Sequence, residues 1–277
     1  MVRRFYLIFS LLLTACVFQK TEYGVWIKNK QDEKLYVHVD GLENAKYHKL
    51  VFIQHGLAAN MEHQVVETAK KAFLDKNYVV VTFDSRYSLG NSGNDVLKAR
   101  ITTFEEDLTA VIDWAKTQPF YSEPFALSGH SMGGYSTLKY SAINNDKINI
   151  LVPITPLVSG SLWEKSCMHN MTAFCLNWKE TGFYKYSDSK TNKTATIPYK
   201  IITDSQKEDA FTFASKIKAK TLLIGAENDI VIDIKDLSKL KKEIAKSNFS
   251  GIASSGHNFE NQQDQTDLYN AIVNFLP

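Results

Sequence analysis

The sequence predicts an α/β protein with a largely parallel β-sheet that is covered by helices on both faces. Short apolar runs alternate along the 277 residues with stretches whose apolar positions recur at helical spacing. Strands and helices that alternate in this way indicate a parallel sheet between two helical layers. The length suits one large domain or two small ones, and a hydrophobic content of 44% with 22% charged residues is ordinary for a globular protein.

The first third of the chain is predicted to form a hairpin followed by two buried strands. VWIKNK (25–30) and KLYVHVDGL (34–42) indicate the hairpin. KLVFIQHG (49–56) and YVVVTFD (78–84) are continuous apolar runs, which are typical of strands buried on both faces. A helix within 61–77 separates these two strands.

The next helix is predicted at 102–118, where TTFEEDLTAVIDWAKTQ places apolar residues at helical spacing. Thr102 or Thr103 is the candidate N-cap, and acidic residues follow in the expected first turn. The remaining elements repeat the same two patterns. Further strands are expected at 125–131, 148–155, 221–229 and 249–257, and further helices near 131–144, 233–247 and 264–276.

One segment interrupts this alternation, and we interpret residues 156–215 as a cap inserted after the strand that ends near Thr155. Two explanations of its aromatic and methionine content are open: an apolar surface for an acyl or aryl group, or packing of the cap on the core. The residues concerned are Trp163, Met168, Met171, Phe174, Trp178, Phe183, Tyr184 and Tyr186.

Cys167 and Cys175 are a candidate disulfide within this cap. On one straight helix they would lie about 12 Å apart, which is farther than a disulfide spans. A bridge therefore requires a bend between them. The alternative is two buried thiols.

The first sixteen residues have the layout of an export signal. MVRR is basic, the apolar run FYLIFSLLL is too short to span a bilayer comfortably, and LTAC follows. LTAC resembles the bacterial lipobox, which implies a signal peptide at 1–15, lipidation of Cys16 and a tether at 16–22. A signal cleaved at an ordinary small-residue site and an uncleaved anchor are the alternatives.

The lipobox resemblance also implies a location, because it makes the protein an exported lipoprotein anchored to a bacterial membrane on its periplasmic side. Val17 follows Cys16, in place of the aspartate that often retains lipoproteins in the inner membrane. This favours the outer membrane of a Gram-negative host.

The charge balance gives no sign of a nucleic-acid partner. The formal net charge is +2, and the densest basic run, KLKKEIAK, is typical of a solvated helix face. Removal of residues 1–15 also removes Arg3 and Arg4, and it leaves 30 basic and 30 acidic residues. Acyl chains, rather than surface charge, would then attach the mature protein to a membrane.

Ser131 is the candidate nucleophile. In ALSGHSMGGYSTLKY (126–140) it lies between Gly129 and Gly133, at the point where an apolar strand ends and a helix begins. Such a turn projects the hydroxyl from the sheet edge and directs the first amides of the helix at the group it attacks. A serine hydroxyl is a weak nucleophile, so it needs a base, and the base needs an orienting carboxylate.

Asp229 and His257 are the candidate acid and base. Each is placed just beyond a buried strand, and the carboxyl ends of parallel strands lie at one edge of the sheet. None of the other six histidines has a comparable place, and the ring of His130 is expected to point away from Ser131. The alternative acids are Asp204 and Asp209 in the cap and Asp233, which could cap the following helix.

Five short motifs in register resemble the α/β-hydrolase family. They are HGLAAN (55–60), FDSRYSLGNS (83–92), GHSMGG (129–134), GAENDIV (225–231) and GHNF (256–259). From residue 23 to 277 the chain resembles capped lipases and esterases, close to the monoacylglycerol-lipase-like and serine-aminopeptidase-like group. The resemblance implies an α/β-hydrolase fold with a small cap, the order Ser–Asp–His, and an oxyanion hole formed by the backbone N–H groups of Leu57 and Met132.

One motif departs from the family pattern D-x-R-G-x-G-x-S. Tyr87 stands where the family often has its first glycine, and Leu89 is an extra residue. In the family this loop borders the active-site entrance, so the departure affects inherited substrate preference. It does not affect the proposed triad.

These residues and the resemblance predict a serine hydrolase that cleaves carboxylic esters, with an apolar or lipid-derived acyl group, through an acyl-enzyme at Ser131. We expect no metal and no organic cofactor, because the cysteines lack paired ligands at metal spacing. Thioesterase and peptidase or amidase activities use the same triad and are alternatives. A catalytically silent, membrane-anchored binding lipoprotein is the alternative of another class, and the retention of a serine, an acid and a base disfavours it.

Overall fold

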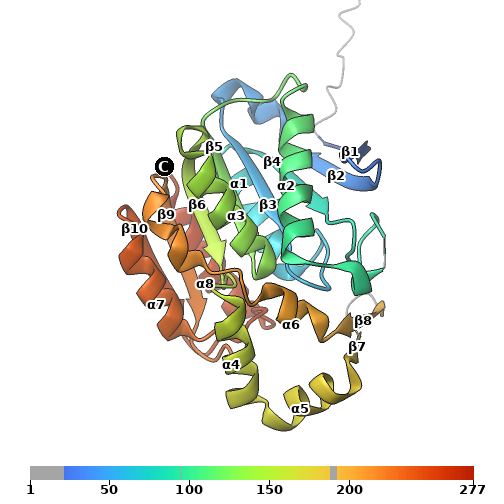
Figure 1. Ribbon diagram of the computed structural model, residues 1–277. Helices are drawn as coiled ribbons and strands as arrows, with labels where there is room; N and C mark the ends of the chain where they lie inside the picture. The colour runs from blue at the N-terminus through green and yellow to red at the C-terminus, as the bar shows by residue number, and fades with distance from the viewer. Residues whose placement is uncertain (1–21, 94, 188–191) are drawn as a thin grey trace, which may run out of the picture.

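The computed structural model describes residues 22–93, 95–187 and 192–277, which form one eight-stranded sheet between two layers of helices (Figure 1). The predicted signal peptide, the candidate lipidation site Cys16 and all of the tether except Glu22 lie outside the described residues. Within the described part, no helix is both long and apolar enough to cross a membrane.

The strands follow the spatial order β1-β2-β4-β3-β5-β6-β9-β10. The pairings from β4 to β10 are parallel, whereas β2 is antiparallel to both β1 and β4. This confirms the predicted fold class. The bounds are β1 (Tyr23–Lys28), β2 (Lys34–Asp40), β3 (Leu50–Gln54), β4 (Val79–Asp84), β5 (Phe125–His130), β6 (Ile148–Ile154), β9 (Lys220–Ala226) and β10 (Ser247–Ile252).

Two separate apolar cores cover the two faces of the sheet. Every residue of β3, β4 and β5 is buried, as the continuous apolar runs predict. Figure 1 shows α2 and α3 in front of the sheet and α1 and α8 behind it. The helices are α1 (Gln64–Leu74), α2 (Ile101–Ala115), α3 (Met132–Ile143), α7 (Ile234–Glu243) and α8 (Gln262–Phe275). Short 3₁₀ helices are η1 (Leu42–Tyr47), η2 (Val96–Lys98), η3 (Asn145–Lys147), η4 (Ala210–Thr212) and η5 (Ala214–Lys216).

The predicted N-cap of α2 is wrong. The helix begins at Ile101, so Arg100 occupies the N-cap position and no acidic residue lies in the first turn. Thr103 is the third helical residue, and its Oγ1 accepts a hydrogen bond from the backbone N–H of Arg100 at 3.0 Å. The hydroxyl therefore stabilises the start of the helix from inside it, as the second half of a capping box does.

The last two strands end earlier than their apolar runs suggest. β9 ends at Ala226 and β10 at Ile252, so Asp229 and His257 both lie in loops. Ser254, two residues after the end of β10, has φ 58°, which is incompatible with an extended strand. The predicted strands at 221–229 and 249–257 are therefore too long at their carboxyl ends.

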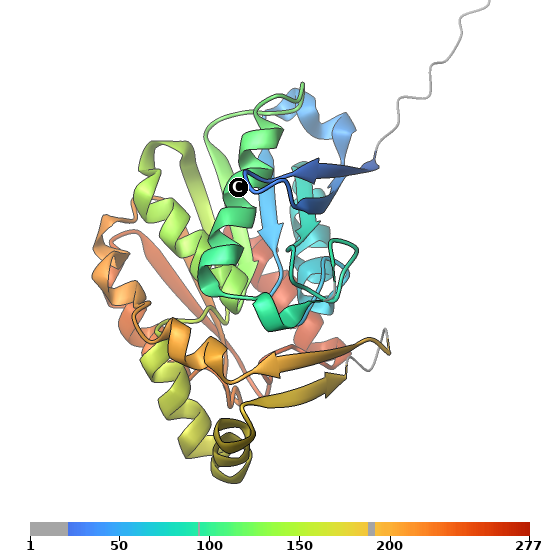
Figure 2. The same ribbon diagram turned by 45° about the vertical axis from the view of Figure 1, so that its right-hand side comes forward.

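The predicted cap region contains the elements between β6 and β9. A helical pair is followed by a two-stranded antiparallel hairpin and a short helix: α4 (Gly160–Asn170), α5 (Thr172–Thr181), β7 (Phe183–Ser187), β8 (Thr194–Pro198) and α6 (Lys200–Ser205). Figure 2 shows this hairpin along one side of the region. Lys193, directly before β8, donates a hydrogen bond from Nζ to the backbone oxygen of Leu89 at 2.9 Å.

The chain bends between α4 and α5, and the bend brings Cys167 and Cys175 together. Met171 separates the two helices with φ −137° and ψ 45°. The two Cα atoms lie 5.9 Å apart and the sulfurs form a disulfide. The bend supplies the geometry that one straight helix lacks.

Candidate active site

Ser131 lies in a sharp turn between β5 and α3, with φ 54° and ψ −116°. A side chain other than glycine in this conformation costs about 1–3 kcal/mol. Three hydrogen bonds hold it: Ser131 donates its N–H to the Ile154 oxygen at 3.0 Å, and its carbonyl accepts from the N–H groups of Tyr135 and Leu157. The serine is therefore fixed by the strand beside it and by the helix after it.

The glycines of GHSMGG are needed because backbones approach closely around this turn. A Cβ atom on Gly129 would lie 2.5 Å from the Gly133 oxygen, and one on Gly133 would lie 2.4 Å from the His55 oxygen. Both distances are too short for a real side chain. The glycines therefore allow α3 to pack directly against the end of β3 and the turn that follows it.

The carboxylate of Asp229 is buried and oriented by its own loop. Its Oδ1 accepts hydrogen bonds from the N–H groups of Val231 at 2.7 Å and Ile232 at 2.9 Å. These two bonds leave Oδ2 directed at His257, and the side chain is only 1% exposed. A buried carboxylate held in this way is a rigid hydrogen-bond acceptor.

His257 joins the acid to the serine. Its Nδ1 lies 2.7 Å from Asp229 Oδ2, and its Nε2 lies 3.0 Å from Ser131 Oγ. Because a carboxylate only accepts, Nδ1 carries the proton and Nε2 is free to accept the serine proton. The structure thus brings together the three residues that the sequence suggested, although 126 positions separate Ser131 from His257.

The alternative acids have other partners. Asp233 is the N-cap of α7 and accepts from the N–H of Lys235, and Asp209 accepts from the N–H of Phe211. Asp204 forms an ion pair with Arg100. The sequence raised capping as the alternative for Asp233, and the structure shows that function.

Met132 directly follows Ser131 in the chain, and Leu57 directly follows Gly56, which lies close to Ser131. Met132 is the first residue of α3, and a Cβ atom on Gly56 would lie 3.0 Å from the Cβ of Ser131. Within the part of the chain that the structure describes, neither the Leu57 nor the Met132 N–H donates to another backbone group. Two such donors beside a serine can bind a developing oxyanion.

His55 holds the turn that carries Leu57, a contribution that the sequence did not suggest. The N–H of Ser85 donates to His55 Nε2 at 2.9 Å, so Nδ1 carries the proton and donates to the Gly56 oxygen at 2.7 Å. Burial lowers the pKa of His55, which keeps the ring neutral. The HG pair at 55–56 was the available signal, but its partner Ser85 is recognised only in three dimensions.

The loop after β4, whose sequence departs from the family pattern, forms hydrogen bonds and ion pairs with the β1–β2 hairpin and with α2. The guanidinium of Arg86 donates from Nε to Asp107 at 2.7 Å and is paired with Glu33 and Glu106. The hydroxyl of Tyr87 donates to Glu33 at 2.6 Å. Tyr87, which stands in place of the family glycine, therefore shares Glu33 of the β1–β2 hairpin with Arg86.

The aromatic residues of the cap region largely pack on one another. Trp178 is 2% exposed, and its Nε1 donates to the Ile197 oxygen at 3.0 Å. Four rings surround it, with centroids between 4.8 and 6.4 Å away: Tyr184, Tyr199, Phe174 and Trp163. Trp178 also belongs to the main buried core, so for the residues around it the structure favours packing, whereas Phe174 and Phe183 remain 38% and 48% exposed.

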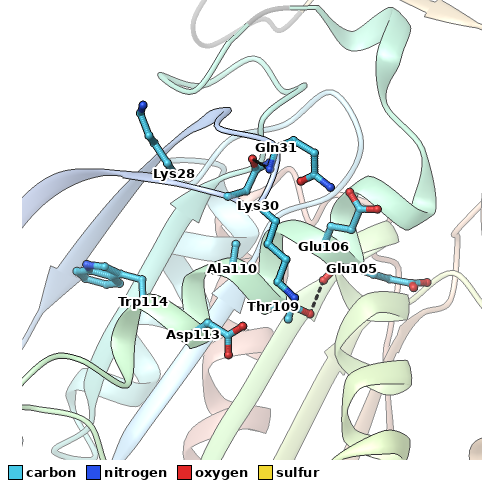
Figure 3. Close-up of a pocket in the computed structure, with 10 residues that line it drawn as sticks. Lys28, Lys30, Gln31, Glu105, Glu106, Thr109, Ala110, Asp113 and Trp114 are labelled. Atoms are coloured by element: carbon cyan, nitrogen blue, oxygen red, sulfur yellow. Dashed lines mark hydrogen bonds between the residues drawn. The ribbon is translucent and has the colours of Figure 1, made fainter.

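A groove of about 590 Å³ lies between the turn after β1 and helix α2 (Figure 3). None of the triad residues lines it. Figure 3 shows Lys30 and Gln31 on the hairpin side of the groove and Thr109, Ala110 and Trp114 on α2. The acidic residues of its α2 wall already have ion-pair partners, namely Glu105 with Lys139, Glu106 with Arg86 and Asp113 with Lys116.

One group of potential metal ligands lies among the described residues, at Glu22, His38 and Asp40. His38 Nδ1 is 3.1 Å from Asp40 Oδ2, and the ammonium group of Lys70 lies 3.9 Å from the same carboxylate. The lysine supplies positive charge to this group of residues. None of them belongs to the triad.

Comparison with known proteins gives a family and a fold. Residues 45–199 match the Hydrolase_4 family model, described as serine aminopeptidase, S33. No curated protein sequence matches the chain.

Three solved structures have a fold similar to that of this chain. Est1E from Butyrivibrio proteoclasticus with bound ferulic acid has a TM-score of 0.73 at 17% identity, over 91% of this chain and 97% of that one. The Pyrococcus furiosus esterase Pf2001 has a TM-score of 0.70 at 17% identity, over 92% and 89%. Mouse α/β hydrolase domain-containing protein 10 has a TM-score of 0.68 at 16% identity, over 91% and 97%. At these identities the likeness is one of fold.

Proposed function

The chain belongs to the serine aminopeptidase S33 family of α/β-hydrolases, and from this premise we propose that it is a serine hydrolase that cleaves carboxylic esters. The observation that carries the proposal is the pair of contacts at His257, 2.7 Å to Asp229 and 3.0 Å to Ser131. This is the geometry that a serine needs in order to lose its proton as it attacks.

In the proposed first step, Ser131 Oγ attacks the ester carbonyl carbon while its proton passes to His257 Nε2. The N–H groups of Leu57 and Met132 donate to the resulting oxyanion, and loss of one such donor costs about 10²–10³ in rate. The carbon–oxygen bond to the alcohol then breaks. The alcohol leaves with the proton from His257, and an ester at Ser131 remains.

In the second step, water attacks this acyl-enzyme and gives a proton to His257. The bond to Ser131 Oγ breaks, the serine recovers the proton and a carboxylic acid is released. Asp229 stabilises the imidazolium in both steps through its 2.7 Å bond to Nδ1.

Hydrolysis of p-nitrophenyl esters from acetate to palmitate by the full chain tests the proposal. We expect turnover that Ser131→Ala abolishes, and labelling of Ser131 by a fluorophosphonate probe. Thioesters and amino-acid p-nitroanilides in the same assay test the thioesterase and amidase alternatives. If the folded wild type shows neither turnover nor labelling, the esterase proposal is refuted and the alternative of a catalytically silent binding lipoprotein is favoured.

The ester substrate that we propose has an apolar or lipid-derived acyl group. Its support is the membrane attachment suggested by the lipobox, since the packed aromatic cluster around Trp178 contributes little to this argument. The optimum chain length in the ester series measures this preference directly. An optimum at acetate would contradict it.

We also propose that Cys16 is lipidated and that the protein is an exported lipoprotein, in the outer membrane where the host has one. The support is LTAC after a short apolar run. Metabolic labelling with an alkyne fatty acid should mark the wild type and should fail with Cys16→Ala. Membrane fractionation then gives the location, and an unlabelled wild type would refute the proposal.

A further inference from the structure

The sheet does not hold the proposed base directly. β10 ends at Ile252, five residues before His257. Ser254 and Phe259, on either side of the base, have φ 58° and 53°. The loop is therefore irregular, and the position of His257 depends on contacts outside the strand ladder.

Two side chains hold the main chain of His257 through its carbonyl oxygen. His130 Nε2 lies 3.0 Å from this oxygen, and Thr155 Oγ1 lies 3.3 Å from it. A carbonyl only accepts hydrogen bonds, so both side chains donate. His130 is the last residue of β5, and Thr155 directly follows β6.

From this geometry we infer that His130 and Thr155 are positioning residues, which hold the backbone of His257 so that Nε2 stays within hydrogen-bonding distance of Ser131. The inference rests on the proposed function. By this inference His130, the histidine of GHSMGG, affects the reaction by holding the base His257 in place and does not contact the substrate.

The same contacts link the base to the other two members of the triad. His130 is the residue directly before Ser131, so one short segment carries the nucleophile and a donor to the base. The N–H of Thr155 donates to the Ile224 oxygen at 2.7 Å, on β9, which leads to Asp229. A shift of either donor would therefore alter the 3.0 Å contact between His257 and Ser131.

His130 is suited to this part because it donates a hydrogen bond without adding a charge. Its ring is 3% exposed, and it packs 4.9 Å from the ring of His257 and 5.4 Å from that of His63. Burial, and after it the nearby His257 and His63, lower the pKa of His130 well below its usual value. A cation at this position would oppose the imidazolium that His257 forms in each step.

The unused nitrogen of the His130 ring supports the same assignment. Within the described residues, Nδ1 is buried and has no hydrogen-bond partner. An unsatisfied buried acceptor costs about 1–3 kcal/mol. A phenyl ring would avoid this cost, and it would lose only the donor to His257.

The experiment compares His130→Phe, His130→Gln and Thr155→Val in the full chain. We expect His130→Phe to lower kcat about tenfold with little change in KM, because misplacement of a catalytic group slows chemistry rather than binding. The Gln variant retains an N–H donor and should recover to within about threefold of the wild type. Thr155→Val, which loses the longer bond, should lose about threefold.

Ser128→Ala is the matched control. The buried Ser128 hydroxyl donates to the Val152 oxygen at 2.8 Å, so its removal breaks a buried bond from a side chain to a carbonyl oxygen, between β5 and β6, without touching His257. This variant should lose stability and retain kcat. The rate of Ser131 labelling by a fluorophosphonate is the second readout, and it should fall in parallel with kcat only in the His130 and Thr155 variants.

The outcomes separate the inference from the proposed function. Labelled wild type with unchanged kcat in His130→Phe overturns the inference alone. The inference is also overturned if kcat falls equally in His130→Phe, His130→Gln and Ser128→Ala, in proportion to the fall in their melting temperatures. A wild type that is neither active nor labelled overturns the proposed function, and the inference with it.

Discussion

At the scale of single residues, Asp229 and Asp233 show how neighbours distinguish two chemically identical side chains. Asp229 accepts from two N–H groups of its own loop and from His257. Asp233, four residues later, accepts from the N–H of Lys235 and starts α7. Both lie after the same strand, so only the tertiary contact with His257 distinguishes the candidate acid of the proposed triad from a helix cap.

Replacement of Asp229 by Asn should reduce kcat about 10³–10⁴-fold with little loss of stability. The amide oxygen can still accept from Val231 and Ile232, which turns the NH₂ group toward His257 Nδ1. The imidazole must then carry its proton on Nε2, where it can no longer accept from Ser131. Ester hydrolysis and fluorophosphonate labelling measure the effect.

Asp233→Asn is the matched control for that variant. Asn is also a good N-cap, so both the activity and the unfolding free energy should stay close to those of the wild type. Equal activity losses in the two variants would contradict the assignment of Asp229 as the acid.

At the scale of secondary-structure elements, the site depends on how closely α3 approaches the end of β3. A Cβ atom on Gly133 would lie 2.4 Å from the His55 oxygen and 2.6 Å from the Gln54 oxygen. Both atoms belong to the backbone, which cannot move aside cheaply. The position of the Leu57 turn beside Ser131 is thus set by the absence of a side chain on α3.

Gly133→Ala should destabilise the protein by about 1–3 kcal/mol and should also abolish most of the activity, because the helix and the Leu57 turn are forced apart. Gly251→Ala in β10 is the control, since its Cβ would lie 3.3 Å from the mobile end of Ile234. Urea unfolding and ester hydrolysis test both variants. Wild-type activity in Gly133→Ala would refute the close approach.

The junction of α4 and α5 offers a second prediction at this scale. The disulfide between Cys167 and Cys175 closes a short loop, which corresponds to about 2–3 kcal/mol of unfolding free energy. The double variant with Ala at both positions should melt earlier and should be cut sooner by protease between residues 156 and 215. Ser131 should still react with the fluorophosphonate.

Reducing agent provides the control for the disulfide variant. Reduction should bring the wild type close to the double variant and should leave the variant itself unchanged. Identical melting of the oxidised wild type and the variant would show that the bridge contributes no stability.

At the scale of the whole molecule, folding buries two histidines that are neutral in the native state. Burial lowers the pKa of both His55 and His130. In the unfolded chain these rings titrate near pH 6.5, as ordinary histidines do. Below that pH the unfolded state binds protons that the folded state does not, so the stability contribution of each ring is present above pH 6.5 and is lost as the pH falls.

Between pH 7.5 and 5.5 the wild type should therefore lose up to about 1.4 kcal/mol more unfolding free energy than His130→Phe, which has no ring to titrate. Urea unfolding at both pH values measures the difference. An equal loss in the two proteins would show that His130 is protonated in the folded state.

The sequence by itself determined what depends on local pattern. The continuous apolar runs predicted β3, β4 and β5, helical spacing predicted α2 and α3, and GHSMGG located the turn at Ser131. These signals are local because burial on both faces, helical period and tight turns each act within a few residues. The order of Ser131, Asp229 and His257 along the chain completed the triad hypothesis.

Tertiary structure decided the contacts that join distant segments. β10 ends at Ile252, and Trp178 is buried within the cap region. His130 and Thr155 both donate to the carbonyl oxygen of His257. A backbone carbonyl is present at every position, so its partner leaves no mark in the sequence. Such bonds arise only when packing has brought the strand ends together, and this is why the residues that contact the proposed triad are harder to predict than its candidate members.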